Sequence, residues 1–536
     1  MEDSRYLNIK YCPCITAYNR RSSDVVLIGD IPVGGDNPVA VQTMTDTDTN
    51  DTQACIDQIG RVYSAGGRIV RLTAQGSGEA ENLKHIADQV KKLYTDTALV
   101  ADVHFLPEVA AIAARYVDKV RINPGNYNDK GGDFHALLEE CRDRGVSLRI
   151  GVNHGSLSER MVSRWGDTPR GMVESAMEFL RICRNAGFGQ VGVSMKSSNT
   201  RVMVHAYRML VAAMNEEGMK YPIHLGVTEA GNGIEGRIKS AVGIGAMLAD
   251  GIGDTIRVSL TEAPEAEIPV AGKLVSYFAQ RASMSASGGI RCAPEYETAL
   301  FNPYEYNRRK TYLSGMLGGD SLPLIMSELE RDEREPGGIN ILTAESGNPV
   351  GEWRSKIIGL DRSGNLKPVI LHRKYDDTDI EDLALKAGAD FGVMFIDGLA
   401  DGIYIESTTD VKQDIIDSIS LDILQASRAR MSKTEFIACP GCGRTLFGLH
   451  ETLEAIKEST SHLKGLKIGV MGCIVNGPGE MADADYGYVG AGPGRITLYR
   501  GKEPVRKNIP QGEALDSLIG LIKSDGRWIE PETGSA

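Results

Sequence analysis

The sequence predicts a multidomain α/β protein whose largest part, in the first half of the chain, is a (β/α)8 barrel, or TIM barrel. Three observations predict this fold. The chain of 536 residues is 42% hydrophobic, which is enough for several packed domains. Between residues 39 and 260, eight short β-rich runs alternate with segments of helical period. The runs also end in polar side chains, and in a closed barrel such strand ends gather at one face.

The eight predicted strands follow one another at the spacing that βα units require. They are, in chain order, VAVQTMT (39–45), IVRLTA (69–74), ALVADVH (98–104), KVRIN (119–123), LRIGVN (148–153), QVGVSMK (190–196), PIHLGVT (222–228) and TIRVSL (255–260). Intervening segments such as 53–67 and 172–187 have apolar residues at helical spacing. The stretch 25–38 has the pattern of a hairpin, which we expect to plug the bottom of the barrel. These elements form a predicted barrel domain over residues 1–285.

An irregular stretch, 283–310, leads into a second α/β region. A weaker βα rhythm follows, with β-like runs at 322–326, 339–344, 367–374, 390–397 and 402–407. Apart from His372, Arg373 and Lys374, these runs show no set of polar ends comparable to that of the barrel strands. We therefore predict an inserted α/β domain over residues 286–425 that acts as a spacer and carries no chemistry of its own.

The last region, residues 426–536, is predicted to be a third α/β domain with cysteines at its strand ends. One strand leads into a Cys-x-x-Cys turn at Cys439 and Cys442, and an amphipathic helix follows. A second strand, KIGVM (467–471), leads to Cys473 and the tight loop NGPGE (476–480). Because the N-terminus of a helix favours anionic sulfur, this domain is a candidate metal-binding unit.

The composition excludes several classes of partner. A formal net charge of −13 argues against a protein that binds nucleic acid or an anionic membrane. No apolar run approaches the length of a transmembrane helix, and the first residues lack an apolar signal core, so we expect a cytoplasmic protein. The nine cysteines, an odd number, indicate reduced thiols rather than a disulfide framework, and Cys12 and Cys14 receive no role.

The predicted strand ends place five cations at one mouth of the barrel, namely Arg71, Arg121, Arg149, Lys196 and Arg257. Their mutual repulsion is costly unless an anion normally lies among them. A multiply charged small molecule, best a phosphate compound, fits such a pocket. The alternative for each arginine alone is a structural salt bridge. Other polar residues at the strand ends are Gln42, Thr43, Thr45, Asp102, His104, Asn123, Asn153, His224, Thr228, Glu229 and Ser259.

The cysteines leave two kinds of metal site open. Three cysteines with no fourth Cys or His nearby make an incomplete zinc site, because structural zinc normally has four such ligands. A [4Fe-4S] cluster also needs four ligands, and Glu480 at the end of the tight loop is a candidate for the fourth. An oxygen ligand among soft sulfurs is easier to displace, which would free one iron for substrate. Zinc ribbons and thioredoxin-like turns share Cys-x-x-Cys, so that motif alone does not decide.

Six motifs together resemble one family. CPGCGRT and GCIVNGPGE near the C-terminus, with VQTMTDT, VRINPGN, GVNHGSL and VSMKSSN in the barrel, are similar to the 4-hydroxy-3-methylbut-2-enyl diphosphate synthase (IspG/GcpE) family. The middle region resembles the inserted domain of the three-domain form of this family, but it is shorter than that insert. The resemblance implies that the C-terminal domain is an α/β [4Fe-4S] domain of the sulfite/nitrite-reductase-like type.

The resemblance also assigns roles to residues. It implies that Cys439, Cys442, Cys473 and Glu480 hold the cluster. It implies that Glu480, Glu229 and Asn476 act as catalytic residues beside the substrate. The residues implied to bind a cyclic diphosphate are Arg71, Asp102, His104, Arg121, Asn123, Arg149, Asn153, Lys196, Arg257 and Ser259.

The implied reaction is the reductive ring opening and dehydration of 2-C-methyl-D-erythritol 2,4-cyclodiphosphate to (E)-4-hydroxy-3-methylbut-2-enyl diphosphate, in the methylerythritol phosphate route to isoprenoids. Reduced ferredoxin or flavodoxin would donate the electrons. The alternatives are a non-redox phosphate-binding barrel synthase with a structural metal domain, an electron-transfer protein, and a zinc-stapled scaffold. Because the insert separates the two halves of the site, we expect the C-terminal domain to close over the barrel of its own chain, in a monomer or weak homo-oligomer.

Overall fold

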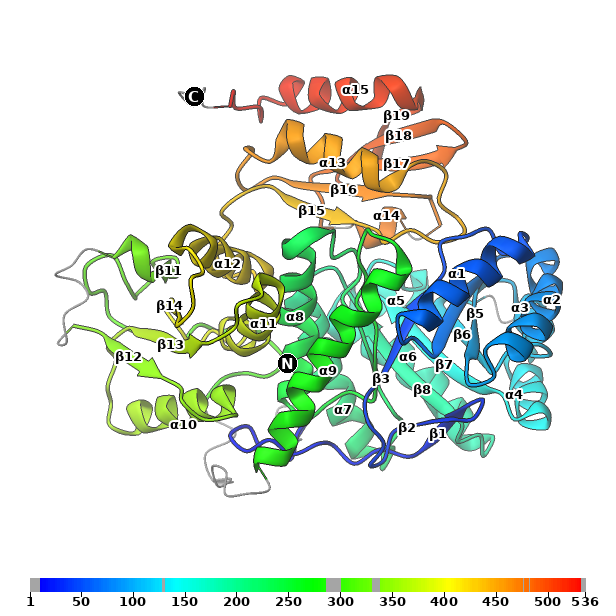
Figure 1. Cartoon of the computed structure of the whole chain (residues 1–536), viewed down its shortest axis with the longest axis horizontal. Helices are drawn as coiled ribbons and strands as arrows, with labels where there is room; N and C mark the ends of the chain where they lie inside the picture. The colour runs from blue at the N-terminus through cyan, green and yellow to red at the C-terminus, as the bar shows by residue number, and fades with distance from the viewer. Residues whose placement is uncertain are drawn as a thin grey trace.

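The computed structural model describes residues 10–127, 131–285, 300–329, 338–475, 477–481 and 483–531. Figure 1 shows three parts: the barrel, the insert beside it and the C-terminal domain above the barrel mouth. Asn476, which the family resemblance places beside the substrate, lies outside the described residues. Among the helices that are described, none combines the length and apolar character needed to cross a membrane.

The eight predicted strands form one parallel sheet in the order β8-β7-β6-β5-β4-β3-β10-β9. A parallel bridge between Val193 and Ile223 joins β8 to the segment before β9, so the sheet closes into a barrel as the alternating pattern predicted. The strands are β3 (Ala40–Met44), β4 (Ile69–Ala74), β5 (Ala98–Phe105), β6 (Lys119–Tyr127), β7 (Ser147–Asn153), β8 (Val191–Lys196), β9 (His224–Leu225) and β10 (Thr255–Ile256).

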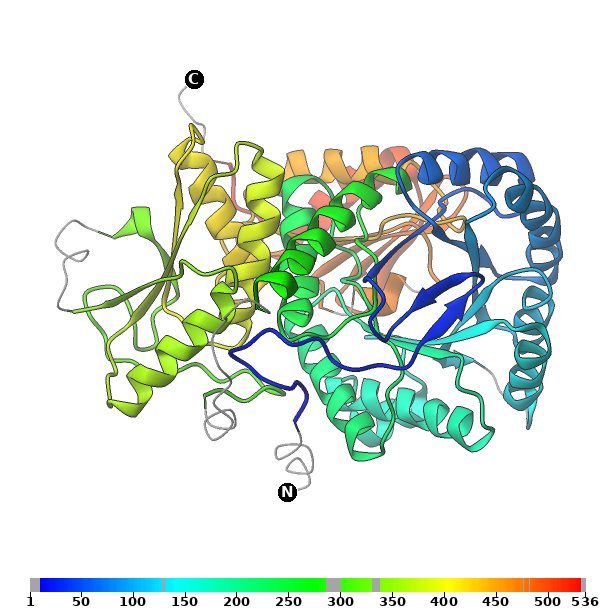
Figure 2. The ribbon, with the colours of Figure 1, turned by 60° about the horizontal axis from the view of Figure 1, so that its bottom comes forward.

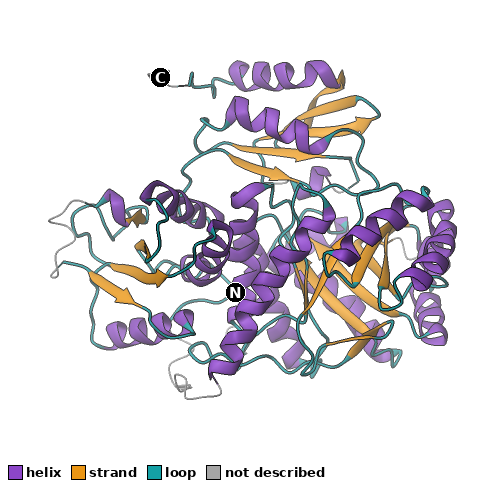
Figure 3. Cartoon of the chain, viewed as in Figure 1, coloured by secondary structure: helices purple, strands orange, loops and turns teal. Residues whose placement is uncertain are grey.

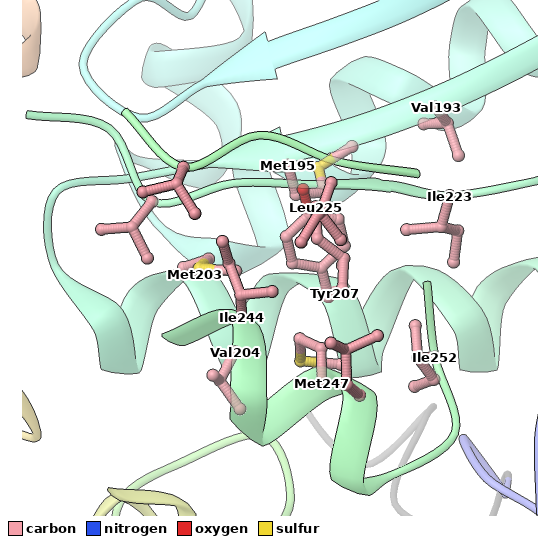
Figure 4. Close-up of a cluster of buried hydrophobic side chains, with 14 of the residues drawn as sticks. Val193, Met195, Met203, Val204, Tyr207, Ile223, Leu225, Ile244, Met247 and Ile252 are labelled. Carbon is pink, nitrogen blue, oxygen red and sulfur yellow. The ribbon is translucent and has the colours of Figure 1, made fainter. Parts of the chain in front are cut away.

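Helices cover the outside of the barrel and bury apolar side chains against it. They are α1 (Thr52–Ser64), α2 (Ser77–Leu93), α3 (Pro107–Ala113), α4 (Asp133–Arg144), α5 (Glu159–Trp165), α6 (Pro169–Asn185), α7 (Thr200–Glu216), α8 (Gly233–Ala249) and α9 (Pro264–Ser285). Figure 4 shows part of this layer, where Val193 and Met195 of β8 lie near Met203 and Tyr207 of α7, all of them buried. Burial of such side chains is the main stabilising contribution to the barrel.

A hairpin covers the bottom of the barrel, as predicted. Its strands β1 (Val26–Ile28) and β2 (Ile31–Val33) pair antiparallel. Val26, Ile28 and Val33 form a separate apolar cluster with residues at the start of β4 and β5, including Ile69 and Ala98. Figure 2 shows this hairpin lying across the barrel end opposite the C-terminal domain. The plug leaves the other end of the barrel for the site.

The insert is an open four-stranded parallel sheet in the order β11-β14-β13-β12, not a closed barrel. Its elements are β11 (Leu324–Ile325), η3 (Met326–Glu328), β12 (Asn340–Thr343), α10 (Pro349–Arg362), β13 (Val369–Tyr375), α11 (Ile380–Ile396), β14 (Gly402–Ser407) and α12 (Gln413–Ala426).

One predicted strand of the insert was wrong. The run 390–397 lies mostly in α11, which is helical from Ile380 to Ile396. Every residue from Ala387 to Ile396 is buried, because this helix packs against α8 of the barrel as well as against its own domain. A helix buried all round has no polar face and therefore no 3.6-residue pattern, so its apolar run resembles a buried strand.

The insert is joined to the barrel through a continuous core. Small residues let α11 and α8 approach closely: a Cβ added at Gly245 would lie 2.7 Å from the Cα of Ala389, and one at Gly392 would lie 2.8 Å from Val242. A fully buried ion-pair network adds to this contact and links Arg208, Asp250, Arg354 and Asp397. The insert therefore braces the barrel over a packed interface.

The C-terminal domain is a five-stranded sheet, β15-β16-β17-β18-β19, with helices on its upper face (Figure 3). The elements are β15 (Glu435–Ala438), α13 (Leu449–Thr460), β16 (Lys467–Met471), α14 (Gly477–Glu480), β17 (Tyr486–Gly492), β18 (Arg495–Arg500), β19 (Glu503–Pro510) and α15 (Gln511–Ser524). Leu453 of α13 and Leu518 of α15 pack in the upper core. A smaller cluster around Met471 and Met481 occupies the other face of the sheet.

The expectation of wholly reduced cysteines was wrong at one position. Seven of the cysteines that are described are free thiols, but Cys14 is disulfide-bonded. Cys12 is buried beside it as a free thiol. Neither residue lies in the site described below.

Candidate functional site

One cavity lies between the barrel mouth and the C-terminal domain, and both parts line it. The barrel contributes Met44, Arg71, Asp102, Arg121, Arg149, Asn153, Ser194, Lys196, Thr228, Glu229, Arg257 and Ser259. The C-terminal domain contributes Cys439, Pro440, Gly441, Cys442, Arg444, Met471, Gly472, Cys473, Gly477 and Glu480. All five cations predicted from the strand ends therefore face the three predicted cysteines across one space.

Arg121 is held rigidly at the centre of the barrel side. Its guanidinium donates to Asp102 Oδ1 at 2.8 Å, to the carbonyl of Gly151 at 3.0 Å and to Asn153 Oδ1 at 3.2 Å. Residue 151 has to be glycine, because a Cβ there would lie 2.5 Å from Arg121 Nε. Such fixed donors bind an anion without first losing side-chain freedom.

The other barrel cations differ in how well they are neutralised. Arg257 is paired with Glu267 of α9, with N–O distances of 2.9 and 3.0 Å. Arg71 lies 3.9 Å from Asp102 and donates to the sulfur of Met44. Arg149 has no hydrogen-bond partner for Nε and Nη1 among the residues that are described.

Burial lowers the pKa of two of these cations. Burial, followed by repulsion from Arg71, lowers the pKa of Arg149 and of Lys196 well below the usual range. An anion in the cavity would stabilise the charged forms of both groups. The barrel mouth is thus built for a ligand that carries more than one negative charge.

His104 and Asn123 lie behind the cavity rather than in its lining. The Nε2 atom of His104 is 2.8 Å from Arg121 Nη1, and its Nδ1 atom is 2.9 Å from the Asn126 side-chain amide. Burial lowers the pKa of His104 to about 4, so the ring is neutral at neutral pH. The Asn123 side chain accepts a hydrogen bond from the amide of Gly125. In this structure both residues support the mouth and do not line it.

Glu229 and Glu480 approach each other from opposite domains. Glu229 follows β9 with a left-handed backbone conformation (φ +50°) and is almost fully buried. Burial, reinforced by the neighbouring Glu480, raises the pKa of Glu229 well above its usual value. Glu480 accepts a hydrogen bond from Asn153 Nδ2 at 2.6 Å. The raised pKa favours the protonated form of Glu229, beside a Glu480 carboxyl group that is hydrogen-bonded to Asn153.

The three cysteines of the C-terminal domain line the same cavity from two strand ends. Cys439 and Cys442 follow β15, and Cys473 follows β16. The amide of Gly472 donates to the Cys439 sulfur at 3.2 Å. Within the ranges described, no three Cys, His, Asp or Glu side chains lie close enough to hold a single metal ion. Zinc would require sulfurs within about 2.3 Å of one point. Three thiols and the Glu480 carboxylate make up the four protein ligands that a [4Fe-4S] cluster takes.

Direct contacts hold the C-terminal domain on the mouth. Residues 230 and 438 form a parallel bridge, and Thr261 Oγ1 donates to the carbonyl of Cys439 at 3.0 Å. Asn199 Nδ2 donates to Asp483 at 3.0 Å on the other side of the mouth. Both halves of the cavity belong to one chain in this arrangement.

The closest approach between the domains predicts a specific defect. Gly155 has φ +81°, and a Cβ there would overlap the carbonyl of Gly479. Gly155→Ala is expected to prevent full closure and to lower turnover by roughly tenfold or more, since a displaced reacting group costs about this much. Metal content should not change. The control is Gly187→Ala, because Gly187 also has a positive φ (+63°) but no atom lies within 4 Å of the added Cβ. Equal effects of the two variants would contradict the view that contact with Gly479 causes the defect.

Some lining residues were not predicted from the sequence. Arg444 lines the cavity from the C-terminal domain, and Met44 and Ser194 line it from the barrel. The only signal for Arg444 was its place two residues after Cys442. Met44 and Ser194 carry no charge, so nothing in the pattern of the strands distinguished them.

The fold and the site together define an anion-binding (β/α)8-barrel protein whose pocket is capped by a cysteine-bearing domain. Two family models match this organisation: the GcpE TIM-barrel domain over residues 23–272 and the GcpE protein C-terminal domain over residues 435–524. The chain belongs to the GcpE family, which confirms the resemblance seen in the motifs.

Near-full-length relatives agree with this assignment. A protein of Phocaeicola vulgatus is 45% identical over 96% of this chain and 99% of its own length, and one of Bacteroides fragilis is 47% identical over 96% and 97%. A protein of Leptospira interrogans is 39% identical over 98% and 100%. All three are named 4-hydroxy-3-methylbut-2-en-1-yl diphosphate synthase (flavodoxin). The first alignment has 614 positions against the 536 residues of this chain, so that relative carries segments which this chain lacks.

Similarity to solved structures is much weaker. A dihydropteroate synthase of Burkholderia cenocepacia matches 49% of this chain and 97% of its own, at 15% identity and a TM-score of 0.34. Similarity at this level does not bear on function.

Proposed function

We propose that the protein converts 2-C-methyl-D-erythritol 2,4-cyclodiphosphate to (E)-4-hydroxy-3-methylbut-2-enyl diphosphate, as an iron-sulfur oxidoreductase of the methylerythritol phosphate pathway. The observation that carries the proposal is the single cavity in which five barrel cations face three cysteines and Glu480. The names of the relatives support the product.

The reaction balances with two electrons. The C–O bond from the tertiary carbon to the diphosphate breaks, and so does the bond to the C3 hydroxyl. A C=C bond forms between these two carbons. The hydroxyl takes one proton and leaves as water, and the diphosphate oxygen leaves with the electron pair of its broken bond and so gains one negative charge. The two electrons supplied by the reductant form the second bond between the two carbons.

The barrel residues bind the substrate and neutralise the diphosphate. Arg121 is oriented by Asp102 and the carbonyl of Gly151, so its donors point at a fixed place. Arg149 and Lys196 supply charge that no described carboxylate offsets directly. Because negative charge grows on the diphosphate as the ring opens, these cations stabilise the transition state more than the substrate.

The cofactor we propose is a [4Fe-4S] cluster held by Cys439, Cys442, Cys473 and Glu480. When bound, the cluster would supply electrons to the substrate one at a time. Asn153 holds the Glu480 carboxylate by a hydrogen bond at 2.6 Å. Glu229 lies beside it with a raised pKa and can give the proton that the departing hydroxyl needs.

Reduced flavodoxin is the electron donor that the names of the relatives favour over ferredoxin. The test is to purify the protein without oxygen, measure iron and sulfide, and add the cyclic diphosphate with reduced flavodoxin. A brown protein that forms the product supports the proposal. A colourless zinc protein that forms none would favour a non-redox phosphate-binding synthase with a structural metal domain.

Removal of one unpaired cation should weaken substrate binding. Lys196→Ala is expected to raise the apparent dissociation constant by roughly tenfold to a hundredfold, because a charge-assisted contact contributes about 1.5 to 3 kcal/mol. The visible spectrum of the cluster should not change, since Lys196 lies on the barrel. Lys84→Ala, an exposed lysine on α2, serves as control. Unchanged affinity in the Lys196 variant would remove the diphosphate from this mouth.

A further inference from the structure

Arg444 is a cation of the site that belongs to the opposite domain from the other five. It follows the Cys-x-x-Cys turn, lines the cavity and is 8% exposed. Its Nε and Nη1 atoms have no hydrogen-bond partner among the residues that the structure describes. Burying donors of a charged group without partners is costly, so the position indicates a missing anion.

The backbone beside Arg444 is wedged between two barrel strand ends. A Cβ at Gly443 would lie 2.6 Å from the carbonyl of Thr47 and 2.8 Å from Thr73 Oγ1. The amide of Cys442 donates to Thr445 Oγ1 at 3.0 Å, which fixes the turn from within. The guanidinium of Arg444 is therefore placed in the mouth only when the two domains are in contact.

Among the described residues, Asp102 is the one carboxylate that forms an ion pair with Arg444, and three cations share it; the Cys442 thiol also interacts with Arg444. Asp102 lies 2.8 Å from Arg121, 3.9 Å from Arg71 and 3.7 Å from Arg444. A single carboxylate cannot neutralise three guanidinium groups. The remaining positive charge calls for a ligand with at least two negative charges, within reach of both domains.

We propose that Arg444 is a sixth substrate-binding cation, which the C-terminal domain contributes to the site and which contacts the diphosphate of the substrate. The proposal rests on the proposed function, because it takes the diphosphate as the anion.

The test compares Arg444→Gln and Arg444→Lys in the cluster-loaded enzyme. We expect Arg444→Gln to weaken binding of inorganic diphosphate, measured by calorimetry, and to raise the KM for the cyclic diphosphate by roughly tenfold to a hundredfold. Arg444→Lys should recover part of both. Iron content and the visible spectrum should stay at the wild-type level.

Matched controls separate this proposal from simpler roles. Arg506→Gln makes the same change at an exposed position on β19 of the same domain and should leave every readout unchanged. Unchanged diphosphate affinity and KM in Arg444→Gln would overturn the proposal. Loss of iron in both Arg444 variants would overturn it too, because it would assign Arg444 to the cysteine site. A wild-type enzyme that forms no product would instead refute the proposed function.

Discussion

Cys473→Ser is expected to lose most of its iron and all measurable turnover. The C-terminal domain offers three thiols to the cavity, two from the turn after β15 and one from the end of β16. Cys473 is the one thiol that β16 contributes. Without it, a cluster would be held only by the two thiols after β15 and by Glu480. A serine oxygen is a much poorer ligand for iron than a thiolate. Iron analysis and anaerobic turnover of the purified variant measure both effects.

Two comparisons give this prediction its specificity. Glu480→Ala should retain a cluster on three thiolates while turnover falls, because the carboxylate is the displaceable ligand. Cys183→Ser changes a buried free cysteine of α6, far from the cavity lining, and should keep its iron. Full iron content in Cys473→Ser would contradict the ligand assignment. Equal iron loss in Glu480→Ala would contradict the exchangeable role of that residue.

The same variant tests whether the site forms within one chain. Cys473→Ser can be mixed with a chain that carries both Arg121→Ala and Lys196→Ala, under conditions that allow subunit exchange. If each cavity is completed by its own chain, as the contacts of Cys439 and Asp483 with the barrel indicate, no activity should return. Restored activity would mean that the domains of different chains combine.

Asp397→Ala is expected to lower the free energy of unfolding by about 3 to 5 kcal/mol, because two buried guanidinium groups then share Asp250 as their one carboxylate partner among the described residues. Asp397 lies 2.6 Å from Arg208 of the barrel and 2.8 Å from Arg354 of the insert. The three side chains are at most 1% exposed. Denaturant unfolding of the variant and the wild type gives the difference.

An exposed ion pair of the same insert provides the control. Asp361 pairs with Arg309 at 2.8 Å but is 39% exposed, so Asp361→Ala should cost no more than about 1 kcal/mol. If the two aspartate variants lost equal stability, the buried network would not hold the insert on the barrel. A large loss of stability in Asp397→Ala alone would show that the insert and the barrel unfold together.

The parts of the fold that repeat locally could be predicted from the sequence. Eight strands and their helices alternate along the chain, and each strand end carries its polar residue at a fixed place after an apolar run. The pattern therefore places five cations at one mouth of the barrel, namely Arg71, Arg121, Arg149, Lys196 and Arg257. The barrel topology confirms that placement, because parallel strands bring all their ends to the same face.

Features that depend on a partner surface could not be predicted in this way. The helix at 380–396 was taken in part for a strand, because its neighbours bury it on every side and remove the polar face. The family resemblance implies that His104 and Asn123 lie beside the substrate; in the structure their side chains contact Arg121 and Gly125, and neither lines the cavity. Only the folded chain shows which of two polar residues on one strand reaches the cavity.

The sequence by itself determined the barrel, the order of the domains and the chemistry of the two half-sites, because periodicity and residue type are local properties of the chain. Only the tertiary structure decided how the halves meet. It brought Arg444 to Asp102 and Glu480 to Asn153, pairs that are separated by more than three hundred residues. It also joins the insert to the barrel through buried ion pairs of Asp397 with Arg208 and Arg354, residues that are far apart in the sequence. Such contacts depend on packing between whole domains, and no short stretch of sequence encodes them.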